Sequence, residues 1–136
     1  MSHPTPIAPS VRKVLEEPNF AFLATVMPDG SPQVTPTWVD IEGDIILVNT
    51  AEGRQKPRNV RRDPRVAITV SPREEPYAYA AIRGRVVNMT QDGADVHADK
   101  MAKKYLGQDR YPFRKPGELR LIMRIQPERI STLRID

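Results

Sequence analysis

The 136-residue sequence contains no cysteine, so disulfide bonds, thiolate zinc sites and cysteine nucleophiles are all excluded. It contains only two histidines, His3 and His97, and neither belongs to a cluster with the spacing of metal ligands. No glycine-rich phosphate loop and no nucleophile elbow around a serine is present. We expect His97 to be a solvated surface residue, and the sequence assigns no catalytic residue and no metal site. An enzyme of this composition would need a bound cofactor to carry its chemistry.

Long apolar runs are also absent. None approaches the ~20 residues that a membrane-spanning helix requires, so we expect no membrane partner. The first residues lack the basic start and apolar stretch of a secretory signal, which favours a cytoplasmic location. The length suits a single domain over residues 1–136, in which the proline-rich residues 1–9, including His3, form a loose arm.

Turn-forming residues, by contrast, are frequent, and the 14 prolines favour short elements. Apolar runs and strict alternation predict strands at 20–27, 32–41, 45–50, 65–70, 77–89, 119–125 and 130–135. Short helices are predicted at about 10–16, 57–62 and 92–105, the first capped by Ser10 and the last by Asp92. We expect a mainly β fold with marginal helix: an antiparallel barrel whose first three strands form a meander. Pro36 predicts an edge strand or bulge, and Gly84 a bulge or a close backbone approach.

A cationic cluster follows the predicted strand 45–50. Arg54 and Lys56 come directly before Pro57, and proline is favoured in the first turn of a helix. A helix that begins there would direct unpaired backbone N–H groups toward the same place as the two cationic side chains. We therefore predict an anion site, suited to phosphate or carboxylate. The later cations are interpreted as a solvated helical face that pairs with Glu52 or Asp63; they are Arg61, Arg62 and Arg65.

A nucleic-acid partner is not expected from this cluster. It is short, and it lacks nearby aromatic side chains on which bases could stack. The net charge of the whole chain is only +4, since acidic residues offset most of the cations.

Two predicted strands could provide walls for the anion site. Along the second strand, alternate residues from Gln33 to Thr37 share one face. Their hydroxyls and the strand's backbone amides could contact the polar edge of a flat ring, whereas Trp38 is expected in the core. Tyr79 lies on the strand 77–89, on a face interpreted as solvent-facing sheet, dimer interface or pocket wall.

Two blocks of the sequence together resemble a known family. They are LATVMPDGSPQVTP at residues 23–36 and RQKPRNVRRDPRVAI at residues 54–68. Over about residues 11–136 the chain resembles the pyridoxamine 5′-phosphate oxidase-like split-barrel superfamily. Within that superfamily it is most similar to the flavin/deazaflavin oxidoreductases of the B class, which depend on coenzyme F420.

This resemblance implies a homodimer of split β-barrels with two cofactor sites at the dimer interface. Arg54 and Lys56 would hold the cofactor phosphate, with Thr50 beside them and Arg58 or Asn59 assisting. The remaining cofactor-binding residues implied are those that line the tricyclic ring, Gln33, Val34, Thr35 and Pro36, and one that closes the site from the partner chain, Tyr79.

The implied activity is hydride transfer between the deazaflavin and a small organic substrate, which the sequence does not identify. Members that bind FMN usually have the two cations adjacent, whereas here one residue separates Arg54 from Lys56, which favours F420. Two alternatives stay open: an FMN-binding oxidoreductase of the same fold, and a non-catalytic protein that binds or carries F420.

Overall fold

The computed structural model describes residues 4–135. The described part contains seven strands and three helices, so the predicted mainly β architecture is confirmed. The elements are α1 (Pro9–Glu16), β1 (Ala21–Val26), β2 (Pro32–Thr37), β3 (Asp40–Glu42), β4 (Ile45–Ala51), α2 (Gln55–Arg62), β5 (Arg65–Val70), β6 (Tyr79–Thr90), α3 (Ala94–Leu106) and β7 (Arg120–Leu133). None of these helices is long and apolar enough to cross a membrane.

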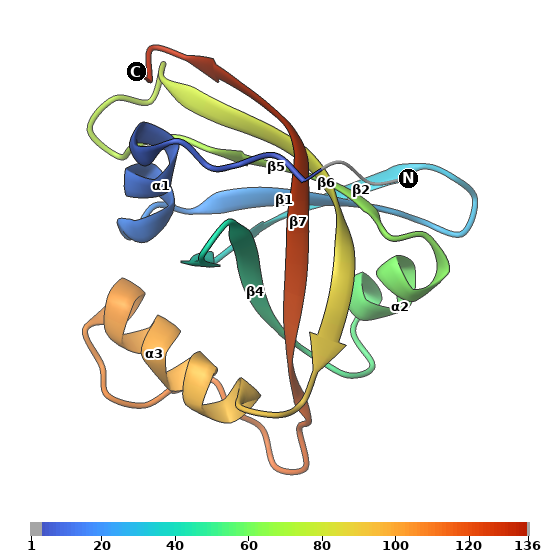
Figure 1. The fold of residues 1–136 in the computed structure, drawn as a ribbon. Helices are drawn as coiled ribbons and strands as arrows, with labels where there is room; N and C mark the ends of the chain where they lie inside the picture. The colour runs from blue at the N-terminus through green and yellow to red at the C-terminus, as the bar shows by residue number, and fades with distance from the viewer. Residues whose placement is uncertain (1–3, 136) are drawn as a thin grey trace.

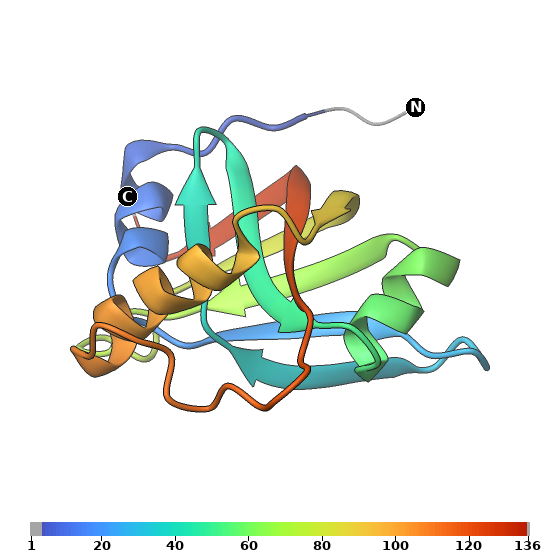
Figure 2. The ribbon, with the colours of Figure 1, turned by 90° about the horizontal axis from the view of Figure 1, so that it is seen from below.

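All seven strands belong to one antiparallel sheet in the order β2-β1-β5-β6-β7-β4-β3. Figures 1 and 2 show this sheet bent on itself, with α2 and α3 at its margins. The predicted meander of the first three strands is wrong, because the stretch 32–41 is two strands. β2 pairs with β1 at one sheet edge, whereas β3 turns back through Gly43 to pair with β4 at the other. The edge position expected from Pro36 is confirmed.

The close backbone approach predicted at Gly84 is also confirmed. A Cβ atom there would lie 2.2 Å from the carbonyl oxygen of Gln126, and the β6–β7 register shifts at this point. Pro127 pairs with Gly84 at this irregularity. The two predicted strands 119–125 and 130–135 are therefore one continuous strand, β7, because the bulge accommodates a proline that would break a regular ladder.

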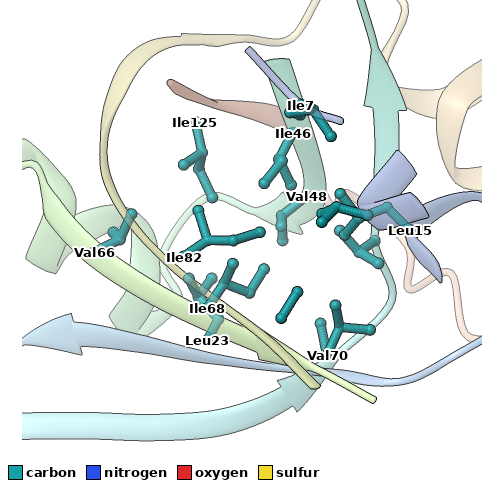
Figure 3. Packing of buried hydrophobic residues seen from close by; sticks show 14 of the residues in the cluster. Ile7, Leu15, Leu23, Ile46, Val48, Val66, Ile68, Val70, Ile82 and Ile125 are labelled. Carbon is teal, nitrogen blue, oxygen red and sulfur yellow. The ribbon is translucent and has the colours of Figure 1, made fainter. Parts of the chain in front are cut away.

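The apolar core fills the inside of the bent sheet. Figure 3 shows core side chains from the segment before α1, from α1, and from β1, β4, β5, β6 and β7. The largest fully buried members of the core include Leu15, Leu23, Ile46, Ile68, Ile82 and Ile125. The alternation predicted for β5 is confirmed, since Val66, Ile68 and Val70 are buried. On the outer face, α3 covers part of β4 and β7 through a second buried cluster of Leu47, Ala94 and Ile122, whereas Phe22, Val34 and Tyr79 are exposed.

The N-terminal segment differs from the prediction of a loose arm. The backbone N–H of Thr5 donates to the carbonyl of Pro127 at 2.9 Å, and its hydroxyl donates to the carbonyl of Glu128 at 2.7 Å. Ile7 is buried in the core, which explains why this segment lies on the barrel. His3 lies outside the described residues. Helix α1 begins at Pro9 after Ala8, so Ser10 is not its cap.

Candidate functional site

A cavity of about 280 Å³ opens between β2, β4, the start of α2, helix α3 and the start of β7. Its volume is close to the lower end of the range for small-ligand pockets, about 300–1,000 Å³. One part of the wall carries cations and the other carries aromatic rings. The lining residues are Phe20, Pro36, Thr37, Trp38, Asn49, Thr50, Arg54, Lys56, Ala98, Met101, Tyr111, Phe113 and Arg120. The cavity wall is therefore built from segments that are distant in the sequence. The ribbons of these segments are drawn in Figure 2.

The cationic part of the wall is the start of helix α2, as predicted. The helix begins at Gln55, two residues before the expected Pro57, and Arg54 is its N-cap residue. No side chain caps the helix, and its first turn contains no acidic residue. Its unpaired N–H groups and partial positive charge therefore add to the charges of Arg54 and Lys56. Arg54 donates to Glu118 at 3.3 Å and is largely exposed.

Lys56 is half-buried and, among the residues that the structure describes, has no hydrogen-bond acceptor and no carboxylate partner. Burial, and then the nearby charge of Arg54, lower the pKa of Lys56. Both effects oppose the charged form, as does the positive end of α2. An anion bound in the cavity would offset all three, so this ammonium group is suited to an anionic ligand.

Of the other cations in the cluster, Arg61 and Arg65 pair with Glu52 and Asp63 on the protein surface, as predicted, whereas Arg62 bonds uncharged groups instead. Arg61 forms two hydrogen bonds to Glu52, of 2.7 and 2.8 Å. Arg65 forms two to Asp63, of 3.0 and 2.7 Å, and Arg62 donates to the Val26 carbonyl.

Arg58 and Asn59 do not line the cavity. Asn59 is fully buried, and its amide nitrogen donates to Thr25 Oγ1 at 2.9 Å while its oxygen accepts from Gln55. The bond to Thr25 attaches α2 to β1, so the Asn59 side chain is structural, contrary to the expected role in phosphate binding. The exposed Arg58 donates to Gln55 at 2.9 Å.

The ring-lining residues expected on β2 are divided between its two faces. Pro36 and Val34 share the outer face of the strand: Pro36 lines the cavity near the end of β2, and Val34 is 62% exposed. Gln33 and Thr35 are partly buried on the inner face, although neither lines the cavity itself. The hydroxyl oxygen of Thr35 is buried without a hydrogen-bond partner among the described residues, so it is free to bond a ligand that reaches this strand.

Thr50 and Tyr79 complete the predicted set. Thr50 is buried at the end of β4 and lines the cavity, beside Arg54 and Lys56 as expected. Tyr79 begins β6 and is 38% exposed, outside the cavity of its own chain. Its contribution from a partner chain stays a prediction.

Aromatic rings form the other part of the cavity wall, which the sequence did not reveal. Trp38, expected in the core, is half-buried and lines the cavity. It stacks on Tyr105, with ring centroids 5.2 Å apart, and meets the edge of Tyr111 at 6.1 Å. Tyr111 in turn meets Phe113 at 5.7 Å. Tyr111 and Phe113 belong to the loop after α3, whose path no periodic pattern predicts.

His97 is buried, and its expected place on the solvated surface is wrong. It follows Ala94 by three residues and precedes Met101 by four, so it shares the apolar face of α3, a spacing that could have revealed its burial. Helix α3 begins at Ala94 after Gly93, whose φ is 74°, so Asp92 is not its cap.

A hydrogen-bond network connects His97 to the cavity. His97 Nε2 lies 3.0 Å from Asp40 Oδ2, and its Nδ1 lies 3.0 Å from Asn49 Nδ2. Asn49 Oδ1 accepts from Arg120 Nε at 2.9 Å. Burial raises the pKa of Asp40, but hydrogen bonds from His97, the Ile41 N–H and Lys100 outweigh burial and hold it well below its usual range. Asp40 is therefore an ionised anchor at one end of the network, and Arg120 is the cation at the other.

The sequence model of the family described as pyridoxamine 5′-phosphate oxidase matches residues 7–134. A solved structure named F420 reductase is 32% identical, with a TM-score of 0.78 over 88% of this chain and 94% of that one. A conserved hypothetical protein from Mycobacterium tuberculosis is 20% identical, with a TM-score of 0.73 over 95% of this chain and 85% of that one. General stress protein 26 from Bacillus anthracis is 16% identical, with a TM-score of 0.68 over 93% of each chain. The latter two likenesses show the fold alone.

Proposed function

The chain belongs to the pyridoxamine 5′-phosphate oxidase family and has its split-barrel fold, and from this premise we propose that it is an oxidoreductase that binds coenzyme F420 in the cavity. The observation that carries the proposal is the half-buried ammonium of Lys56, which has no partner within residues 4–135 and lies beside Arg54 at the start of α2. The likeness to the F420 reductase supports the choice of cofactor.

The residues present fit such a cofactor. Arg54, Lys56 and the first N–H groups of α2 are suited to its phosphate. The flat surface of Pro36, on the cavity wall, suits the face of a tricyclic ring. The hydroxyl of Thr35, which has no partner among the described residues, would bond the polar edge of a ring that extends along β2 beyond the cavity wall. Thr50 closes the wall between strand β4 and the cations.

When bound, the deazaflavin supplies a hydride or accepts one. The chain's own residues would bind the cofactor, orient its ring and exclude water from its face. Trp38, Tyr111 and Phe113 provide the apolar part of this enclosure. The substrate would be a small organic molecule that occupies the space left between the ring and these aromatic side chains.

The proposal includes a homodimer in which Tyr79 of each chain reaches the cavity of the other. Tyr79 is exposed on the outer face of the sheet, where a second chain could cover it. A homodimer would then contain two equivalent cavities, each completed by both chains.

A turnover measurement separates an enzyme from a carrier. Reduced F420 is mixed with the protein under anaerobic conditions, and the return of the oxidised cofactor's absorption is followed after adding quinones, conjugated ketones or aldehydes. The proposal predicts protein-dependent oxidation with at least one acceptor and less of it with the Lys56→Gln variant. Tight binding of F420 without oxidation across the panel would instead identify a carrier.

A further inference from the structure

We propose that Arg120 forms a second anion-binding point in the cavity, which takes the carboxylate or another anionic oxygen of a flat, conjugated molecule held against Tyr111 and Trp38. The proposal deepens the proposed function, on which it rests for the claim that this molecule is the substrate. The binding event itself involves only this chain's residues.

Arg120 is a buried cation with an unused donor. Its side chain is only 3% exposed, yet it lines the cavity. Nε donates to Asn49 at 2.9 Å and Nη1 donates to Glu118 at 2.9 Å. Nη2 makes no hydrogen bond within the described part of the chain. Glu118 also pairs with Arg54, so one carboxylate is shared between two guanidinium groups and a positive charge is left over.

The orientation of Arg120 is fixed by a chain of side chains behind it. Asn49 Nδ2 donates to the carbonyl of Ala94 at 2.9 Å and faces His97 Nδ1 at 3.0 Å, so the amide oxygen must point toward Arg120. His97 then presents its Nε2–H to the ionised Asp40. Asn49, His97 and Asp40 therefore act as positioning residues, since they hold the guanidinium in one place before a ligand arrives.

The surroundings of Arg120 determine the class of ligand. The Tyr111 ring lies 4.7 Å from the guanidinium carbon, and Tyr111 contacts both Trp38 and Phe113 edge to face. A planar guanidinium beside aromatic faces suits a ligand that combines a flat apolar body with an anionic oxygen. A purely inorganic anion would leave the aromatic wall uncovered.

The test uses 2-naphthoate as the probe and neutral 2-naphthamide as its matched control, without any cofactor. The chain has one tryptophan, so the indole N–H resonance of Trp38 reports on this cavity in an NMR titration of the ¹⁵N-labelled protein. We expect naphthoate to shift this resonance and that of Arg120 Nε–H, and to bind about tenfold more tightly than the amide, the effect of one charge-assisted hydrogen bond.

Two variants, each with an arginine of β7 replaced by lysine, test the role of Arg120. Arg120→Lys keeps the charge but loses the planar fork, and should lower naphthoate affinity by about tenfold. Arg124→Lys is the control, because Arg124 bonds Asn88 and Thr90 away from the cavity, and should leave the affinity unchanged.

Equal binding of naphthoate and the amide, or an unchanged affinity in Arg120→Lys, would overturn the proposal. So would competition by inorganic phosphate at equal concentration, because Arg120 would then serve the same anion as Lys56. If the Arg120→Lys variant does not fold, the affinities of the wild-type protein for naphthoate and for the amide still test the proposal. If the protein binds F420 but does not prefer naphthoate over the amide, only the second anion-binding point at Arg120 is rejected. If it binds naphthoate as expected but does not bind F420, the proposed cofactor is rejected.

Discussion

Lys56 is the single residue on which the proposed anion site depends most. Its charge is opposed by burial, by Arg54 and by the start of α2, and no described residue offsets it. An arrangement that is unfavourable in the empty protein becomes favourable when an anion arrives. This pattern is typical of residues retained for binding and not for stability.

Replacing Lys56 with Gln should weaken F420 binding by about 1.5–3 kcal/mol, the range for hydrogen bonds to charged groups. The measurement is a titration followed by quenching of Trp38 emission. Arg61→Gln is the matched control, because Arg61 belongs to the same helix but pairs with Glu52 on the surface. Equal affinities for the wild type and Lys56→Gln would remove Lys56 from the site.

Asp40 gives a prediction about pH. Its pKa is lower in the folded chain than in the unfolded chain, so its ionised form stabilises the fold at neutral pH. That contribution should be lost as the pH falls below about 4, the value for an unperturbed aspartate. Urea unfolding of the wild type and Asp40→Asn should show a difference of about 2 kcal/mol at pH 7 that narrows toward pH 3. If the difference in unfolding free energy between the two proteins stays constant from pH 7 to pH 3, the ionised Asp40 does not stabilise the fold in this way.

The sequence reveals the charge of a residue but not always its surroundings. The roles of Arg61 and Arg65 could be predicted because their acidic partners, Glu52 and Asp63, lie close in the chain. The roles of Asn59 and Asp40 could not be predicted, because their partners are distant in the sequence and come near only in the folded barrel.

Strands β6 and β7 form the longest ladder of the barrel, and their irregularity at Gly84 and Pro127 is its most constrained point. Alternation predicted most strands because half-buried strands repeat every two residues. The alternation pattern gave a wrong strand boundary at Pro127, because a proline usually ends a strand but here lies within β7. It also failed between Thr37 and Asp40, where an apolar stretch concealed the crossing from one sheet edge to the other.

Gly84→Ala should destabilise the protein by about 3 kcal/mol, because the new methyl group would meet the backbone of β7, which cannot move aside without disturbing the ladder. Gly30→Ala is the comparison: Gly30 has a φ of 88° in an open turn, so only local backbone strain of about 1 kcal/mol is expected. The urea concentration at the midpoint of unfolding, compared with that of the wild type, measures the loss of stability in each variant. Equal losses would mean that the contact with Gln126 is easily relieved.

At the scale of the whole molecule, the site depends on segments that the sequence keeps apart. β2, the β4–α2 junction, α3 and the loop before β7 each supply part of the cavity wall. The cationic part was predictable, because a strand end and a helix start determine its position. The aromatic part was not, because the path of the loop after α3 depends on contacts such as Arg114 with Asp99.

The outer face of the sheet is the expected dimer interface. Pairing register places Phe22, Val34 and Tyr79 on this face, where they are 51%, 62% and 38% exposed. Phe22→Glu should convert the dimer to a monomer by placing a charge in the interface. Light scattering should give twice the 15.4 kDa chain mass for the wild type and for a control, Val96→Glu on α3, but a single mass for Phe22→Glu. A monomeric wild type would rule out the homodimer.

Binding preference between F420 and FMN tests the central claim most directly. Both cofactors are titrated into the wild-type protein under identical conditions, with emission from the single tryptophan as the signal. The proposed site predicts saturable binding of F420 at micromolar concentration or below, and at least about tenfold weaker binding of FMN, a difference of about 1.4 kcal/mol. Tighter binding of FMN would make this a flavin protein, and binding of neither would return Lys56 and Arg54 to an ordinary charged surface.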